Sequence, residues 1–352
     1  SSSLMIYNDI NVKDAFSALG LPRKDVQNYH HFGCNWPSPG SHSYWLHGWP
    51  AAIAFQAFES AEEAAQISSA YVRSSDRGWP DVFLSILREV RDDPSVTIET
   101  LYLRFRQVMV DFISQKTENG VRELRVRRRK PWAVCFFTDC FTEAPIETGE
   151  CFSACARYVF ALQSFEMFGT VCDCFTVVDA LCFRDRKITI NDLLRAVDAN
   201  FEGYEQILAM CRRVPKYGSD DAFSNGHVRR LSEMMAQITR EIGTKYVKSD
   251  GFFLVPCLQS DTWHLKDGLQ YGATPDGRLA GVPISDAASP AYGVDTNGPT
   301  AAFLSLCKPD YRLVSCGTVV NQKYTPDMLR DPVKRAALTA AIQVYFSQGG
   351  QE

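Results

Sequence analysis

The sequence lacks the features of several large classes of protein. It contains no run of about 18 apolar residues, so no transmembrane helix is predicted. Residues 1–7 have no basic cluster and only a short apolar stretch, unlike a signal peptide. The 37 Lys and Arg residues are balanced by 41 Asp and Glu residues, and a net charge of −4 gives no general attraction to nucleic acid or anionic lipid. We therefore expect a cytoplasmic protein that binds neither nucleic acid nor membrane.

The common catalytic signatures are also missing. There is no G-x-S-x-G, Walker A, G-x-G-x-x-G or H-E-x-x-H motif, which excludes most hydrolases, NTPases and dinucleotide-dependent dehydrogenases. No period of about 20 to 50 residues repeats, so solenoids and propellers are excluded. The 12 cysteines do not follow the repeated C-x₂-C spacing of metal sites, and we expect mostly buried, reduced thiols and no bound metal.

The composition suits a large α/β fold. Hydrophobic residues make up 45% of 352 residues, enough for a sizeable core. Periodicity predicts helices, and a continuous apolar run predicts one buried strand. The expected helices are 59–73, 98–112 after a cap at Thr97, 190–212 after a Thr189/Asp192 capping box, 228–242 ending at Gly243, and 333–346; the expected strand is 132–137. Residues 251–322 are rich in Gly and Pro and are expected to form long functional loops.

Two loops carry the most chemical information. In the first, residues 29–40, Cys34 follows Gly33 and precedes Pro37 and Pro39, so a thiol is presented in a stiffened turn. The second, residues 271–278, contains the turn signal Pro-Asp-Gly. Considered separately, the first loop could simply hold a buried core cysteine, and the second could be an ordinary turn.

Several blocks in a fixed order resemble the glycyl radical enzymes of the pyruvate formate-lyase-like superfamily. The resemblance covers nearly the whole chain. Its blocks are Asn8-Asp9, 29–34, 214–221, 272–278 with Ser289-Pro290, 297–301 and 317–323. It implies an α/β fold that is part of a ten-stranded barrel with many surrounding helices. In that family a cysteine loop and a glycine loop meet at the centre of the barrel, away from water and oxygen.

The resemblance also implies the site and the domain organisation. Cys34 matches the family's catalytic cysteine, which becomes a thiyl radical and abstracts hydrogen from a small organic substrate. Residues 1–352 would form a single partial barrel domain: 1–50 the cysteine-loop segment, 51–250 mainly helical with buried strands, and 251–352 Gly/Pro-rich loops, strands and a terminal helix.

Two departures qualify the resemblance. The family's R-V-S-G-Y/F-type radical loop is missing from the sequence, so we expect the glycyl radical domain to be absent and the radical to reside on a residue outside this chain. That radical would be installed by a radical S-adenosylmethionine activating enzyme, and no cofactor would bind to this chain. The chain would then be a piece of a longer or split enzyme, inactive alone, with a separate glycyl radical subunit as one option and a homodimer as the family's usual assembly.

The second departure concerns the reaction. Eliminating members carry a glutamate base two residues after the cysteine, where this chain has Trp36. We therefore expect a reaction that makes or breaks a C–C bond, of the decarboxylase or fumarate-adding type, on an apolar or aromatic substrate. The expected substrate-binding residues are His31, Phe32, Asn35, Trp36 and Tyr158. Two alternatives stay open: a lyase eliminating across C–O, C–N or C–S bonds, and a degenerate, non-catalytic scaffold.

Overall fold

The computed structural model describes residues 8–32, 36–40, 43–45, 78–129, 140–141, 143–258, 263–322 and 324–351. The expected helix 59–73 and the expected strand 132–137 lie outside these ranges.

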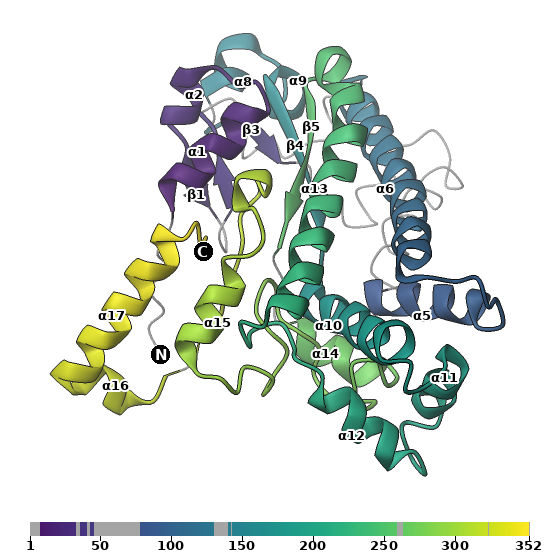
Figure 1. Cartoon of the computed structure of the whole chain (residues 1–352). Helices are drawn as coiled ribbons and strands as arrows, with labels where there is room; N and C mark the ends of the chain where they lie inside the picture. The colour runs from purple at the N-terminus through teal and green to yellow at the C-terminus, as the bar shows by residue number, and fades with distance from the viewer. Residues whose placement is uncertain are drawn as a thin grey trace.

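A three-stranded parallel sheet organises the molecule. Its strands β3 (Ser43–Trp45), β4 (Tyr158–Ser164) and β5 (Phe252–Cys257) lie in the order β3-β4-β5. Parallel strands need long crossover connections, and helices supply them here. One face of the sheet packs on α6 (Ile98–Arg129) and α13 (Ala222–Asp250), and the other on α1 (Asp9–Ala18) and α2 (Arg23–Gln27), as Figure 1 shows. The described residues thus form a covered sheet, and the ten-stranded barrel is not seen among them.

Successive side chains of β4 and β5 point to opposite faces of the sheet, so they reach the two helical layers in turn. Phe160 and Phe253 face α1, where the Phe16 and Phe160 rings meet edge to face with centroids 6.1 Å apart. Val159 and Phe252 face the α6/α13 layer. Because both faces are covered, nearly every residue of the two strands is apolar.

The predicted helix 190–212 is two helices, α11 (Ile190–Asp198) and α12 (Glu205–Arg213). The Thr189/Asp192 capping box is confirmed. The prediction of one continuous helix was wrong. Asn200, Phe201 and Gly203 adopt positive φ, which ends α11 and turns the chain. Phe201 is buried, so the apolar stripe that suggested one helix continues across the break.

The predicted end of a helix at Gly243 was also wrong. Helix α13 continues to Asp250, and Gly251, with φ of 61°, forms its left-handed cap. Gly243 lies inside the helix where α13 approaches β5, since a Cβ there would be 3.0 Å from Leu254 Cβ.

The other elements complete the helical layers. They are α5 (Trp79–Val90), α8 (Glu143–Thr148), α9 (Phe152–Cys155), α10 (Phe168–Val178), the π-helix η2 (Asp179–Arg184), α14 (Trp263–Gln270), α15 (Pro299–Leu306), the 3₁₀ helix η3 (Tyr311–Leu313), α16 (Pro326–Arg330) and α17 (Pro332–Ser347). The expected helices at 98–112 and 333–346 are confirmed as parts of α6 and α17. Residues 251–322, expected to be mainly loops, also contain β5, α14 and α15. All ten cysteines in the described part are free, and burial raises the pKa of Cys172 and Cys174.

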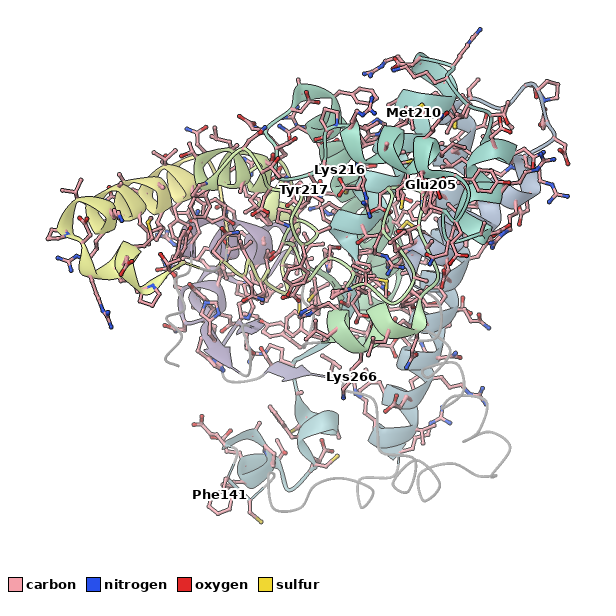
Figure 2. The ribbon with its side chains drawn as sticks, turned by 90° about the horizontal axis from the view of Figure 1, so that it is seen from below. Phe141, Glu205, Met210, Lys216, Tyr217 and Lys266 are labelled. Atoms are coloured by element: carbon pink, nitrogen blue, oxygen red, sulfur yellow. The ribbon has the colours of Figure 1, made fainter. Side chains whose placement is uncertain are left out.

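Three of the sequence blocks meet in one buried junction. The Tyr217 backbone N–H donates to Asp173 Oδ1 at 2.7 Å, and the Tyr217 hydroxyl donates to the Ala288 carbonyl at 2.8 Å. The Asn297 amide donates to the Ser219 carbonyl at 2.8 Å. Figure 2 shows Tyr217 in this region beside Lys216. These hydrogen bonds therefore link segments 44 to 78 residues apart, and the two made by Tyr217 are buried.

A substitution at Gly218 tests how tightly this junction is packed. Its φ is 100°, and a Cβ would lie 2.7 Å from Pro290 Cγ, so Gly218→Ala introduces both backbone strain and a clash. We expect a loss of about 2 to 4 kcal/mol in the free energy of unfolding, measured by urea denaturation. The matched control is Gly293→Ala, where φ is 77° and no atom lies within 4 Å, so only the strain of about 1 to 2 kcal/mol is expected. Equal losses for the two variants would contradict the packing argument.

Candidate functional site

Cys34 lies, in sequence, midway between the paired strands of a short hairpin. Strands β1 (His30–Phe32) and β2 (Trp36–Ser38) are antiparallel, and Phe32 pairs with Trp36. Cys34 and Asn35 themselves lie outside the described residues. The structure therefore brings together the backbones of two predicted substrate-binding residues, Phe32 and Trp36, on either side of the cysteine segment.

His31, the middle residue of β1, lies near Tyr29 and Asp9. The Tyr29 hydroxyl donates to the Asp9 carboxylate, and the Tyr29 and His31 rings meet edge to face with centroids 5.3 Å apart. Burial lowers the pKa of His31, and the negative charge of Asp9 acts in the opposite direction. His31 is thus expected to be neutral near pH 7, where its imidazole can accept a proton.

Tyr158, the remaining predicted substrate residue, is engaged at the amino end of β4. Its hydroxyl donates to Asp25 Oδ2 at 2.6 Å, and Tyr158 pairs with Ser43 of β3. Burial, followed by the hydrogen bond to Asp25, raises the pKa of the phenol. A role of Tyr158 in substrate binding stays a prediction.

The carboxyl ends of β4 and β5 hold polar groups that sequence reasoning missed. Parallel sheets commonly bind ligands at this edge. Gln163, near the end of β4, is buried, and its amide donates to the Ser164 carbonyl at 3.0 Å. Burial lowers the pKa of Lys116 on α6, opposed by the charge of Glu166, which follows β4. The available signal was a glutamine inside the apolar run of residues 158–164.

A second titratable cluster joins α14 to the loop that follows it. His264 Nδ1 lies 3.2 Å from Asp286 Oδ1, and His264 Nε2 lies 2.9 Å from the Tyr292 hydroxyl. The Asn321 amide donates to Asp286 Oδ2 at 2.6 Å. The His264 imidazole is therefore hydrogen-bonded to Tyr292 and lies close to the Asp286 carboxylate, although Nδ1 and Oδ1 do not form a hydrogen bond. The half-exposed Tyr292 also lines a cavity of about 710 Å³ with Arg212, Asp220 and Asn297.

The loop 271–278 is a structural turn. Gly277 has φ of 92°, and the Gly277 N–H donates to the Thr274 carbonyl at 3.0 Å. The buried Arg278 guanidinium donates to the carbonyls of Gly272, Leu279 and Val282. These bonds use the side chain to hold its own loop together.

Two further properties concern metals and membranes. In the ranges the structure describes, no three or more His, Cys, Asp or Glu side chains gather as a metal site would require. Within the same ranges, no helix has the length and apolar character needed to cross a bilayer.

Two family models match the chain. The model described as pyruvate formate lyase-like matches residues 1–252, and the model described as glycine radical matches residues 284–352. The second match corrects the expectation that the glycyl radical domain is absent, because part of the chain is assigned to it. Since the sequence has no R-V-S-G motif, the match does not identify a radical glycine.

Similar proteins of known activity are longer than this chain. Trans-4-hydroxy-L-proline dehydratase of Clostridioides difficile is 31% identical over 72% of this chain and 31% of its own length. Isethionate sulfite-lyase of Bilophila wadsworthia is 36% identical over 53% of this chain and 22% of its own length. The 4-hydroxyphenylacetate decarboxylase glycyl radical subunit of Clostridioides difficile is 26% identical over 51% of this chain and 22% of its own length. The chain thus spans about a third or less of these relatives.

Solved structures share the fold. The substrate-bound hydroxyproline dehydratase of Clostridioides difficile superposes with a TM-score of 0.77 at 22% identity, covering 98% of this chain and 42% of that one. The glycerol-bound, B12-independent glycerol dehydratase of Clostridium butyricum gives a TM-score of 0.76 at 22% identity, with the same coverage. The family match over residues 1–252 and this shared fold agree: the chain belongs to the pyruvate formate lyase-like family of glycyl radical enzymes.

Proposed function

We propose that this chain is part of a glycyl radical enzyme in which Cys34 acts as a thiyl radical on a small organic substrate. The observation that carries the proposal is the pairing of Phe32 with Trp36, which stand on either side of the cysteine segment in the sequence. In this proposal the pairing positions Cys34 for its target, and positioning of this kind is a large part of catalysis.

In the proposed reaction, the Cys34 sulfur atom first accepts a hydrogen atom and later returns it. The Cys34 thiyl takes a hydrogen atom from a substrate C–H bond, which forms the S–H bond and leaves a carbon radical. After rearrangement, the product radical takes the hydrogen atom back and regenerates the thiyl. The radical would come from a glycyl residue outside this chain, activated by a radical S-adenosylmethionine enzyme. The three-stranded sheet would be one part of a ten-stranded barrel that encloses these steps.

We favour a reaction at a C–C bond. Trp36 occupies the position of the eliminating members' glutamate and has no group that accepts a proton. The similar decarboxylase glycyl radical subunit acts, by its name, on an arylacetate. In this proposal His31, Phe32, Asn35, Trp36 and Tyr158 contact the substrate.

Elimination is the second candidate, and a specific observation favours it. The relatives with the higher identities are a dehydratase and a sulfite-lyase. In an eliminating enzyme built on this chain the base would be His31, whose pKa is lowered by burial and which can therefore accept a proton near pH 7.

Replacing the cysteine tests the radical mechanism. The chain is co-expressed without oxygen with the portion of the fold that it lacks and with an activating enzyme, and the glycyl radical is followed by electron paramagnetic resonance. We expect Cys34→Ala to keep the glycyl signal and to lower turnover by at least about a thousandfold, because the hydrogen-abstracting atom is gone. The matched control, Cys140→Ala, removes an exposed thiol and should leave both unchanged. Full activity of Cys34→Ala would refute the mechanism, and a wild type with neither signal nor turnover would favour a non-catalytic scaffold.

The products separate the two reactions. Incubating the assembled wild type with 4-hydroxyphenylacetate, trans-4-hydroxy-L-proline and isethionate tests one C–C and two eliminating substrates. Release of carbon dioxide from the first supports C–C chemistry. Loss of water or sulfite from the others would instead establish elimination with Trp36 at the usual base position.

The lowered pKa of His31 makes stability depend on pH. The unfolded chain, with an ordinary histidine pKa of about 6.5, binds a proton more readily than the folded chain, so acid favours unfolding. The His31 contribution to the free energy of unfolding should be constant above about pH 7 and decrease as the pH falls below about 6.5. Urea denaturation at pH 7.5 and 5.5 should therefore show a smaller loss for His31→Asn than for the wild type. An identical loss in both proteins would show that His31 titrates normally.

A further inference from the structure

A cavity of about 710 Å³ lies between three segments of the chain, apart from the β1/β2 hairpin. Its walls come from the end of α12 with the following residues within 212–221, and from residues within 276–283 and 291–297. Figure 1 shows α12 at the lower end of the molecule and β1 in its upper half. Small-molecule sites commonly have volumes of about 300 to 1,000 Å³, so this cavity has room for a small organic ligand.

Two arginines at the end of α12 bring positive charge to the cavity. Arg212 and Arg213 are exposed, and neither side chain forms a hydrogen bond or ion pair with any residue in the described ranges. The stem of Arg212 lies against the turn at Gly277, since a Cβ there would be 3.3 Å from Arg212 Cγ. Cations at the end of a helix also offset its dipole, but that role leaves the N–H donors of both guanidinium groups unused.

Two carboxylates at the cavity are already engaged by other groups. Asp220 Oδ1 accepts from the Asn225 amide at 3.1 Å and lies 3.7 Å from Lys308 Nζ. Asp221 Oδ1 accepts from two backbone N–H groups in the first turn of α13, at 2.9 and 3.2 Å. Neither carboxylate therefore neutralises the two arginines.

The buried charged groups of the cavity wall are likewise bound within the protein. Asp276 Oδ1 accepts from the Thr274 hydroxyl and, at 3.4 Å, from the Arg278 backbone N–H. The Lys216 ammonium donates to two backbone carbonyls, at 2.5 and 2.9 Å. The charge that remains for a ligand is that of the two arginines, which favours an anion.

Part of the cavity wall is apolar. Tyr292 is 49% exposed and Val282 is 41% exposed, and both line the cavity. The buried His264 holds Tyr292 in place, because its Nε2 lies 2.9 Å from the Tyr292 hydroxyl and the two ring centroids are 5.7 Å apart. A ring fixed in this way offers a surface against which the apolar body of a ligand can pack.

We propose that this cavity is a binding site for a small aromatic anion, separate from the proposed site at Cys34. Arg212 and Arg213 bind its phosphate or carboxylate group, because planar guanidinium groups donate paired hydrogen bonds to such oxyanions. The aromatic body of the ligand packs against Tyr292. Binding here requires neither the radical nor the Cys34 thiol.

Calorimetric titration of the purified protein at low ionic strength tests this site, with phenyl phosphate, benzoate and inorganic phosphate as probes. We expect phenyl phosphate, benzoate or both to bind, and the tighter of the two identifies the oxyanion that the site prefers. Arg212→Gln/Arg213→Gln should lower the affinity at least tenfold, because both cations are lost. Tyr292→Ala should lower the affinity for the aromatic probe several-fold, because the packing surface is lost.

The matched control, Arg229→Gln/Arg240→Gln, removes the same charge from exposed positions of α13 and should bind the probes like the wild type. Since all four arginines are exposed, both double variants should keep the wild-type melting temperature.

Four outcomes would overturn the inference. Failure of both aromatic probes to bind the wild type, or equal affinity in Arg212→Gln/Arg213→Gln, would show that the cavity is not such a site. An equal loss in the control would show that only the net charge matters. Inorganic phosphate that binds as tightly as the aromatic probes would indicate an adventitious ion only. Cys34→Ala should bind the probes normally, which separates a failure of this site from a failure of the radical mechanism.

Discussion

The structure depends on the parallel pairing of β4 with β5 and on the covering of both faces of that pair. Six consecutive residue pairs, from Val159 with Phe252 to Ser164 with Cys257, define the register. A slip of one residue would turn Phe160 and Phe253 from α1 towards α6 and α13. Neither packed layer could then form, so the two helical layers and the strand register specify each other.

The hairpin that brackets Cys34 is attached to this sheet through β3. Ser43 pairs with Tyr158 and Trp45 with Phe160, which joins the segment after the hairpin to the central strand. Val159 and Phe160 of β4 are fully buried, so this attachment runs to the core of the molecule.

Short sequence motifs predicted those helix starts that depend only on hydrogen bonds between neighbouring residues. The Thr189/Asp192 capping box and the helix after Thr97 satisfy their own backbone N–H groups, so both could be predicted from a few adjacent residues. The limits of α12 and α13 could not. Gly243 resembles a helix end, and only the approach of Leu254 explains a glycine inside α13.

The candidate site likewise combines features that the sequence predicts with features that only tertiary packing sets. The order of the blocks predicted the family and pointed to Cys34, but no spacing rule could place Asp9 beside Tyr29 or His264 between Asp286 and Tyr292. Those contacts join residues about 20 to 28 positions apart through tertiary packing, which the sequence does not display. The glycine radical match over residues 284–352 likewise differs from the expectation, because the absence of one motif does not exclude the rest of the domain.

The contacts of Asn8 and Asn11 with Gly349 and Gly350 have a consequence for the order of folding. They join residues 338 to 342 positions apart, the longest loops that hydrogen bonds close in the described structure. Contacts of such separation form late, because their loop-closure entropy must be overcome by structure already in place. During synthesis, the side-chain amides of Asn8 and Asn11 would lack these partners until residues 349 and 350 leave the ribosome. The packing of α17 would then be among the last steps in the folding of the described residues.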